Sequence, residues 1–292
     1  MPRKLHRRDK GLPEGLREPV GDGAAGATRR IQIGQGSAGI ERLEAHFVGP
    51  AFSPHRHDTY AIGITLAGVQ TFHYRGERRL CLPGQCHILH PDETHDGGAA
   101  TADGFGYRIV YVDPSLIQQA LGGRPLPFVV DPVVDRSVFE NALPAALWHL
   151  EDPIDDAAQV ELTTAVADML TTAAARTGAA KGGSLRLAAL QAVRDLITAR
   201  PAAPLSLETL ESVSGLDRWT LARQFRAAFG TSPSSFRTMR QLDQVRRLIR
   251  DGHPLAAAAF AAGFADQSHM SRMFKRTYGL TPATWAASVA HR

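Results

Sequence analysis

One segment of the chain occurs twice, and this repeat constrains the fold more than any other feature. The first copy runs from Leu221 to Phe236 and the second from Met270 to Trp285. Arg, Phe, Gly, Pro and a final aromatic residue recur in both copies at a constant offset of 49 residues. Each copy predicts a helix that ends at a C-cap glycine, followed by a Ser/Thr N-cap and a proline that opens the next helix.

An apolar helix and a glycine turn precede each copy of the repeat. Residues 205–213 lead into the turn at 215–216, and residues 255–262 lead into the turn at 263–264. Helix, glycine turn and helix make up the helix-turn-helix motif, so the chain is expected to carry two such units in tandem. A long helix at about 233–250, with apolar residues at helical spacing, should fix the distance between them.

The size and composition are those of a globular protein with about two domains. The chain has 292 residues, of which 43% are hydrophobic and 21% charged, and ~150 residues is a usual domain size. No apolar run approaches the ~18 residues that span a bilayer, so we expect no membrane contact. Cys81 and Cys86 are too few for a disulfide framework, which favours a cytoplasmic location with both thiols buried.

The charge is distributed unevenly along the chain. From Leu185 onward there are 15 Lys/Arg against 7 Asp/Glu, whereas the preceding residues carry 18 against 22. A basic C-terminal part that contains tandem helix-turn-helix units indicates a partner that is a polyanion, namely double-stranded DNA.

The chain divides into four parts by pattern. Residues 1–30 show no periodicity and are expected to form a disordered tail. Short alternating β-type runs between turn residues fill 31–112, and helical patterns follow to about 177, so we predict one domain at 31–177. The glycine-rich segment 178–184 is predicted to be a linker, and 185–292 an all-α DNA-binding domain.

Histidines gather in the strand region. His55 and His57 are two residues apart, so on a strand they share a face, and His87, His90 and His95 follow. With the Pro-Gly turn after the strands and the segment ending at His95, this pattern resembles the cupin fold, which implies an antiparallel β-barrel.

Catalytic cupins bind a metal through two His, a Glu and a later His. The resemblance places His55, His57 and His95 in that set, but the Glu falls near Ala61 or Ile62, neither of which can bind a metal. A three-histidine zinc site stays open. Our prediction is a polar pocket with no metal and no cofactor.

Each predicted recognition helix presents polar side chains at its start. Asp217 is the expected N-cap of the first helix, with Leu221 and Phe225 turned inward, and the second helix begins near Asp266. Such a helix inserts its N-terminal side chains into the major groove, where Arg pairs with guanine and Gln with adenine. Arg226, Lys275 and Arg276 are expected at phosphates. The predicted DNA-binding residues are Arg218, Trp219, Thr220, Ala222, Arg223, Gln267, Ser268, His269, Ser271, Arg272 and Lys275.

The C-terminal part resembles the DNA-binding domain of the AraC/XylS family of transcriptional regulators, most closely over Gly263–Pro282. The N-terminal part resembles the ligand-binding and dimerisation domain of the same family. The chain departs from the family at Glu211, where alanine is usual and where the second unit has Ala259, and at Val245, also usually alanine. Glu211 must reach solvent or a basic partner, or else the first unit is loosened.

The resemblance implies an α+β protein with an N-terminal cupin-like antiparallel β-barrel and a C-terminal domain containing two helix-turn-helix units. It implies a homodimeric regulator of promoter DNA, most often an activator that contacts RNA polymerase, controlled by a small effector in the barrel. We expect no enzymatic activity. The effector should lie among His55, His57, Tyr60, Tyr74, His95 and Tyr107.

Two other functions compete with that of a regulator. A metal-dependent cupin enzyme fused to a DNA-binding module is the alternative, and the absent Glu argues against it. DNA-repair methyltransferases use a similar DNA-binding module, but they need a cluster of thiolates that two cysteines cannot supply.

Overall fold

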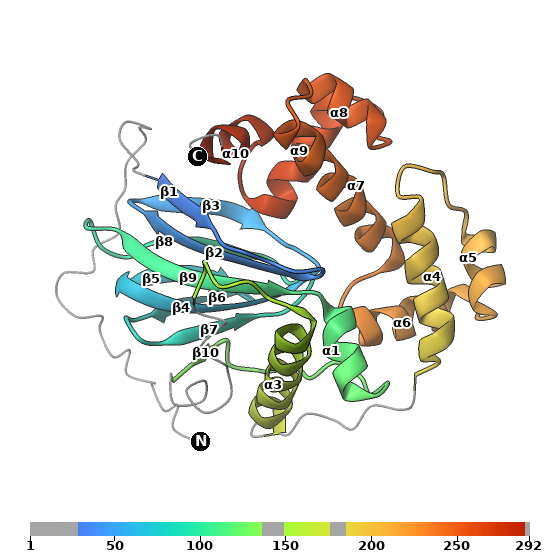
Figure 1. Ribbon diagram of the computed structural model, residues 1–292, viewed down its shortest axis with the longest axis horizontal. Coiled ribbons are helices and arrows are strands. Elements are labelled where there is room, and N and C mark those ends of the chain that lie inside the picture. Colours follow the sequence, from blue (N-terminus) through green and yellow to red (C-terminus); the bar gives the residue numbers. More distant parts are fainter. Residues whose placement is uncertain (1–28, 136–148, 176–184, 290–292) are drawn as a thin grey trace, which may run out of the picture.

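The computed structural model describes residues 29–135, 149–175 and 185–289 (Figure 1). The first 28 residues of the predicted tail and the predicted linker at 178–184 lie outside these ranges. Within them, none of the helices is both long and apolar enough to span a bilayer.

The N-terminal part is built from two antiparallel sheets. The first has six strands, in the order β1 (Arg29–Ile33), β2 (Ile40–Phe47), β9 (Phe105–Val112), β4 (Tyr60–Gly68), β7 (Cys86–Leu89) and β10 (Val133–Val134). The second has four, in the order β3 (Pro50–His55), β8 (His95–Ala99), β5 (Gln70–Tyr74) and β6 (Glu77–Cys81). The predicted antiparallel fold is confirmed, although no pairing among the described strands joins the two sheets into a closed barrel.

Alternation along the strands produces two apolar layers. On β4, Ala61 faces the layer between the two sheets, whereas Ile62 faces the outer side of the six-stranded sheet. Two helices, α1 (Pro114–Leu121) and α3 (Asp156–Ala175), pack on that outer side through residues such as Ile117 and Val166. The apolar face of α3 therefore belongs to the core of the N-terminal part.

The helical pattern expected from 113 to about 177 is only partly correct. Between α1 and residue 135 the chain is not helical, and it includes the short strand β10. The reason is local: Gly122 has φ 59° in the left-handed region and ends α1, and Pro125, Pro127 and Pro132 follow. Residues 136–148, which form part of the stretch expected to be helical, lie outside the described residues.

Arg42 on β2 anchors the segment that leads into α3. Its side chain is fully buried, and its guanidinium donates to the carbonyl oxygens of His149 (2.6 Å), Leu150 (3.3 Å) and Asp152. A buried charge is tolerated where such acceptors surround it. Arg42 therefore ties the approach to α3 to β2, the strand beside the β1 edge of the six-stranded sheet.

The C-terminal part contains seven described helices and two apolar cores. The helices are α4 (Leu187–Ala199), α5 (Leu207–Ser214), α6 (Arg218–Phe229), α7 (Pro233–Arg250), α8 (Leu255–Ala261), α9 (Gln267–Tyr278) and α10 (Pro282–Val289). Phe236 of α7 lies in the core of the first helix-turn-helix unit, and Leu242 and Val245 lie in the core of the second. The predicted connecting helix thus belongs to both units.

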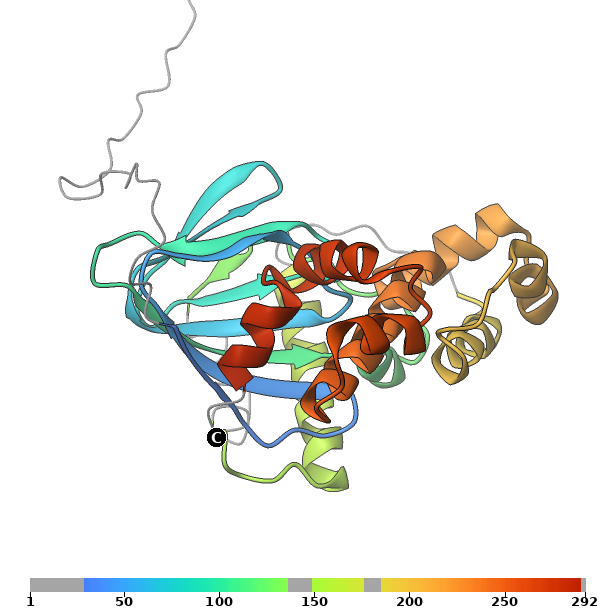
Figure 2. The same ribbon diagram turned by 90° about the horizontal axis from the view of Figure 1, so that it is seen from above.

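The predicted helix boundaries of the repeat are confirmed. Asp217 caps α6 by accepting from the N–H groups of Trp219 and Thr220, and Asp266 caps α9. Gly230 and Gly279 end the two recognition helices, α6 and α9, in the left-handed conformation (φ 73° and 69°). Within the second unit, α9 lies against β3 and α10 against β1, whereas α4 and α5 lie at the far end of the molecule (Figures 1 and 2).

Candidate DNA interface and effector site

None of the predicted DNA-binding side chains is buried. Trp219 is 78% exposed at the start of α6, while Thr220 and Ser271 are half-buried. The remaining eight are also exposed: Arg218, Ala222, Arg223, Gln267, Ser268, His269, Arg272 and Lys275. Leu221, Phe225 and Phe274 face the cores. These exposures are those that base and phosphate contacts require, and the DNA-binding roles themselves stay predictions.

The structure resolves both departures from the family pattern. Glu211 on α5 pairs with Arg218 at the start of α6, Arg218 Nε lying 3.2 Å from Glu211 Oε1, so it has the basic partner that its position demanded. Val245 is fully buried in the core of the second unit. Both helix-turn-helix units are therefore packed despite the larger side chains.

His55, His57 and His95 come together at the end of the four-stranded sheet. His55 pairs with His95 across β3 and β8. The ring centroid of His95 lies 4.3 Å from that of His55 and 4.9 Å from that of His57. The Nδ1 atoms of the three rings face the carbonyl oxygens of Ser53, Thr59 and Glu93 at 2.9–3.0 Å. A carbonyl only accepts, so the ring proton belongs on Nδ1 and each Nε2 is an acceptor. We call these three residues the histidine site.

Burial keeps the histidine site uncharged. Desolvation lowers the pKa of His55 to about 4 and that of His57 to about 3, and it also lowers the pKa of His95. The buried Nε2 atom of His57 has no hydrogen-bond acceptor or donor beside it. The site thus offers neutral acceptor nitrogens to a molecule that can donate hydrogen bonds.

The donor set does not support a resident metal. Nδ1-protonated histidines can bind metals through Nε2, but the described residues contain no group of three or more His, Cys, Asp or Glu arranged to hold an ion. Ala61 and Ile62, where the cupin glutamate would fall, are fully buried apolar residues. The metal-dependent enzyme alternative therefore gains no support here.

The three predicted effector-site tyrosines are dispersed. Tyr74 pairs with His95 across β5 and β8, although its hydroxyl is 2.9 Å from His90 Nδ1. Tyr107 stacks on Phe47 between the sheets. Tyr60 faces the opposite side of its strand, in the core with α1 and α3, and its hydroxyl donates to the Pro127 carbonyl. The structure thus brings Tyr74 to the histidine site and separates Tyr60 from it.

Tyr111 is a neighbour of the histidine site that the sequence prediction missed. Its ring meets the His57 ring edge-on at 5.2 Å. Strand alternation from Tyr107 places Tyr111 on the same inward face, so the period of β9 could have identified it. His87 also lies inward, against Phe72.

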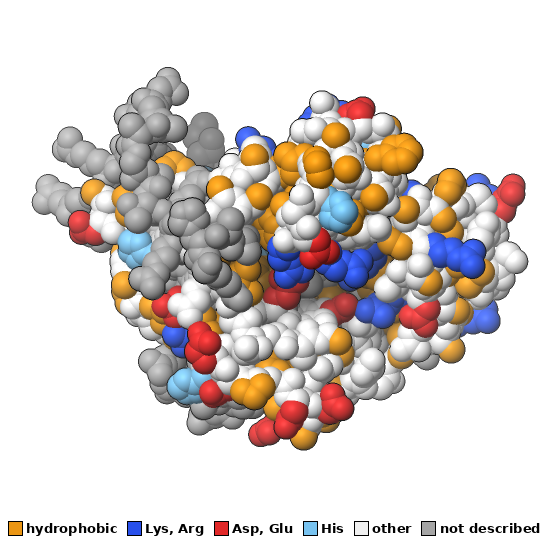
Figure 3. Space-filling view, turned by 45° about the horizontal axis from the view of Figure 1, so that its top comes forward, with side chains coloured by type: hydrophobic (Ala, Val, Ile, Leu, Met, Phe, Trp, Pro, Cys, Tyr) orange, Lys and Arg blue, Asp and Glu red, His pale blue; other side chains and the backbone are white. Residues whose placement is uncertain are grey.

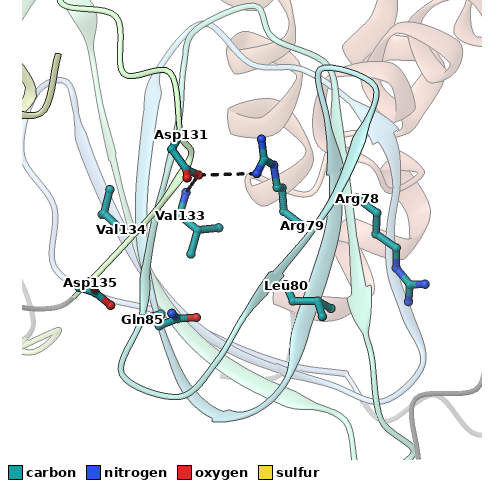
Figure 4. A pocket seen from close by; sticks show the side chains of 8 residues that line it. All are labelled: Arg78, Arg79, Leu80, Gln85, Asp131, Val133, Val134 and Asp135. Carbon is teal, nitrogen blue, oxygen red and sulfur yellow. Dashed lines mark hydrogen bonds and ion pairs between the residues drawn. The ribbon is translucent and has the colours of Figure 1, made fainter. Parts of the chain in front are cut away.

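Two surface hollows lie on the N-terminal part. One, of about 480 Å³, includes Tyr74 and His95 in its wall, together with Pro54, His73, Arg75, Gly76, Asp92, Glu93, Thr94 and Asp96. The other, of about 440 Å³, lies at the sheet edge beside β6 and β10, where Asp131 accepts from the Val133 N–H and faces Arg79 (Figure 4). Only the first hollow adjoins the histidine site.

The N-terminal part contacts the end of the first recognition helix. Gly230, which ends α6, lies so close to Pro91 that a Cβ atom there would be 2.5 Å from the proline Cβ. The Leu126 N–H donates to the Ala227 carbonyl of α6 at 3.0 Å. Only glycine allows this approach.

The end of the second recognition helix is contacted in the same way. A Cβ atom at Gly279 would lie 2.9 Å from Phe52 Cβ and 3.1 Å from His55 Nδ1. The Arg56 N–H donates to the Arg276 carbonyl of α9 at 3.0 Å. Equivalent glycines of the two repeats therefore touch the segments that carry His55, His57 and His90.

Ion pairs cross the same boundary. Asp92 faces both Arg56 (3.3 Å) and Arg226 of α6 (3.4 Å). Three further pairs join an N-terminal carboxylate to a C-terminal guanidinium: Asp58–Arg240 at 2.7 Å, Arg194–Asp113 at 2.9 Å and Arg246–Glu41 at 3.0 Å. Basic side chains gather along the seam beside acidic ones in Figure 3. The opposite charges of the two parts, which we attributed to DNA, thus also serve their mutual contact.

Comparison with known proteins agrees with this architecture. Residues 37–170 match the AraC-like ligand binding domain, and residues 211–288 match a helix-turn-helix domain. The chain belongs to the AraC/XylS family of transcriptional regulators. It is 26% identical to the HTH-type transcriptional regulator YbfI of Bacillus subtilis over 239 residues, which cover 79% of this chain and 86% of that protein.

Two further similarities cover different extents of the chain. The multiple antibiotic resistance protein MarA of Salmonella typhimurium is 25% identical over 103 residues, or 35% of this chain and 81% of MarA. ToxT from Vibrio cholerae shares the two-domain fold, with a TM-score of 0.58 over 91% of this chain and 99% of ToxT, at 10% identity. The predicted family and fold class are confirmed.

Proposed function

We propose that this AraC-family regulator reads promoter DNA with its two recognition helices and is controlled by a small effector that binds at the histidine site. One observation carries the proposal: the segments bearing His55, His57 and His90 contact the C-terminal ends of both α6 and α9. A displacement of these segments by a bound molecule is transmitted directly to both helices. No long coupling route through the protein is required.

Control of this kind requires that the effector bind the two domain arrangements with different affinity. His55 supplies the link, since its ring belongs to the histidine site and its Nδ1 adjoins Gly279 at the end of α9. ToxT, which has the same fold, has been solved bound to an unsaturated fatty acid, so such a fold accommodates a small molecule. In this chain the effector contacts the histidine site, Tyr74 and the adjoining hollow.

The DNA contacts divide into base reading and phosphate binding. Base edges are read by the exposed side chains of the first turns of α6 and α9, which include Arg218, Arg223, Gln267 and Arg272. Arg226 meets phosphate on DNA. In the described arrangement Asp92 pairs with Arg226, so docking of the N-terminal domain and DNA compete for the same guanidinium.

The regulator acts in the cytoplasm as a homodimer and activates transcription through contact with RNA polymerase. Membership of the AraC family supports activation.

Two experiments test this proposal. Genomic fragments that bind the purified full chain are isolated and footprinted, and protection of paired sites about one helical turn apart is expected. Protection of no site refutes DNA reading by the paired helices. Genes beside those sites suggest inducers, and the His55→Ala/His57→Ala double variant should then lose the inducer response while keeping its footprint. An unaltered response would show that the effector binds elsewhere.

A further inference from the structure

Glu211 reaches across the turn of the first helix-turn-helix unit to the start of α6. Its Oε1 atom accepts from the Arg218 backbone N–H at 2.8 Å and from Arg218 Nε at 3.2 Å, and its Oε2 atom accepts from Arg218 Nη2 at 3.3 Å. One carboxylate therefore fixes both the backbone and the guanidinium of the same residue. The Arg218 side chain remains 51% exposed, so it can still reach DNA.

The backbone N–H groups at the start of α6 are already occupied. The Glu211 carboxylate accepts from the Arg218 N–H, and the Asp217 carboxylate accepts from the N–H groups of Trp219 and Thr220 at 3.0 and 3.1 Å. These N–H groups are the ones that a helix N-terminus can otherwise offer to a phosphate. A DNA phosphate at this end would also face two carboxylates, so α6 must meet DNA through its side chains.

The second unit lacks this device. Ala259 stands where the first unit has Glu211, and it is fully buried in the core. Asp266 alone caps α9 from the turn, accepting from the His269 N–H at 2.6 Å, and Gln267 takes the place of Arg218 as the first helical residue. The two recognition helices therefore differ in how their first side chain is held.

We propose that Glu211 is a positioning residue that sets the base specificity of the first recognition helix by holding Arg218 toward one base pair. The inference rests on the proposed DNA-reading role of Arg218. A free arginine pairs with any phosphate, whereas a guanidinium held in one plane presents a fixed pair of donors to guanine O6 and N7. Because Glu211 engages Nε and Nη2, the Nη1 end is left for DNA. The carboxylate also offsets the charge of Arg218 and so weakens its attraction to phosphate.

The test is selection of binding sites from a randomised double-stranded DNA pool by the full chain. Four variants are compared: Glu211→Gln, which keeps an acceptor for the Arg218 N–H, Glu211→Ala, Arg218→Ala, and the Glu211→Ala/Arg218→Ala double variant. Glu208→Gln, which removes an exposed carboxylate from the same helix, is the matched control.

Both single Glu211 variants should weaken the preference for the base pair that Arg218→Ala also loses, by at least about fivefold. Their affinity for non-specific DNA should rise, and the slope of log affinity against log salt should steepen by about 0.9, as one more phosphate is bound. In the double variant, the preference should equal that of Arg218→Ala alone. Glu208→Gln should keep the parent preference.

Two results would overturn the inference. One is a parent-like preference in both Glu211 variants. The other is a preference loss from Glu211→Ala that persists when Arg218 is already alanine, because it would mean that Glu211 only stabilises the helix start. A parent chain that enriches no sequence refutes the proposed DNA reading itself, a different outcome from both.

Discussion

Alanine at Gly230 or Gly279 should separate the two domains without unfolding either one. Both glycines have positive φ, and an added Cβ would lie 2.5 Å from Pro91 or 2.9 Å from Phe52, distances at which the atoms must move apart. Gly215 is the matched control, because it also ends a helix with positive φ (61°) but has open space around its Cβ position.

The expected sizes follow from these contacts. A left-handed alanine costs about 1 kcal/mol in all three variants relative to glycine. The variants at Gly230 and Gly279 lose docking energy in addition, about 1 kcal/mol for each interdomain backbone hydrogen bond that lengthens. Those bonds are donated by the N–H groups of Arg56 and Leu126. A docking loss of about 2 kcal/mol corresponds to roughly 30-fold faster opening at these two amides.

Hydrogen exchange resolved to single amides is the assay. Gly230→Ala and Gly279→Ala should accelerate exchange at Arg56 and Leu126, while exchange inside the sheets stays at the parent rate. Gly215→Ala should leave both interdomain amides as protected as in the parent chain. Equal protection at Arg56 and Leu126 in all three variants would show that these close approaches do not hold the domains together.

Three further predictions concern DNA, acid and the core. Arg272→Ala should weaken specific binding by about 1–3 kcal/mol in a gel-shift titration, whereas Lys275→Ala should weaken binding to all sequences and flatten the salt slope by about 0.9; equal losses on specific and random DNA from both would contradict this division. Burial lowers the pKa of His57 to about 3 in the folded chain, whereas an unfolded chain has a histidine pKa of about 6.5. Between these two pH values only the unfolded chain binds the proton, so the free energy of unfolding should fall as the pH drops from ~6.5 toward 3. In urea titrations the loss of stability between pH 7 and pH 5 should be about 2 kcal/mol smaller in His57→Gln than in the parent chain, in which His55 and His95 also contribute to the loss; an unchanged pH slope in that variant would refute the shift. Arg42→Met should lower the free energy of unfolding by about 3 kcal/mol, because buried carbonyls lose their donor, with the exposed Arg223→Met as the unaffected control.

Local chemistry explains what the sequence could predict. The glycine that ends each recognition helix and the Asp217 cap depend on neighbouring residues alone, so the tandem units and their boundaries were predictable. Strand alternation was also sufficient to predict which side of the sheet a residue faces. It could have placed Tyr60 with Ile62 on the outer face and Tyr111 on the inner one.

Docking of the two domains was not predictable in this way. Asp58 and Arg240 are 182 residues apart, and no periodicity relates them. The charge difference between the two parts indicated a polyanion, but it could not show that part of the basic surface pairs with carboxylates of the same chain. The ion pair between Glu211 and Arg218 likewise depends on the turn that brings the two residues together, and the sequence alone did not identify Arg218 as the partner.

The sharing of α7 between two cores limits how this protein can change in evolution. Each residue inserted into a helix turns everything beyond it by about 100° and advances it by about 1.5 Å. An insertion between Phe236 and Leu242 would therefore rotate the whole second unit away from both the sheets and its place on the duplex. Loops can lengthen freely in descendants of this chain, whereas α7 should keep its number of residues even where every exposed side chain on it has been replaced.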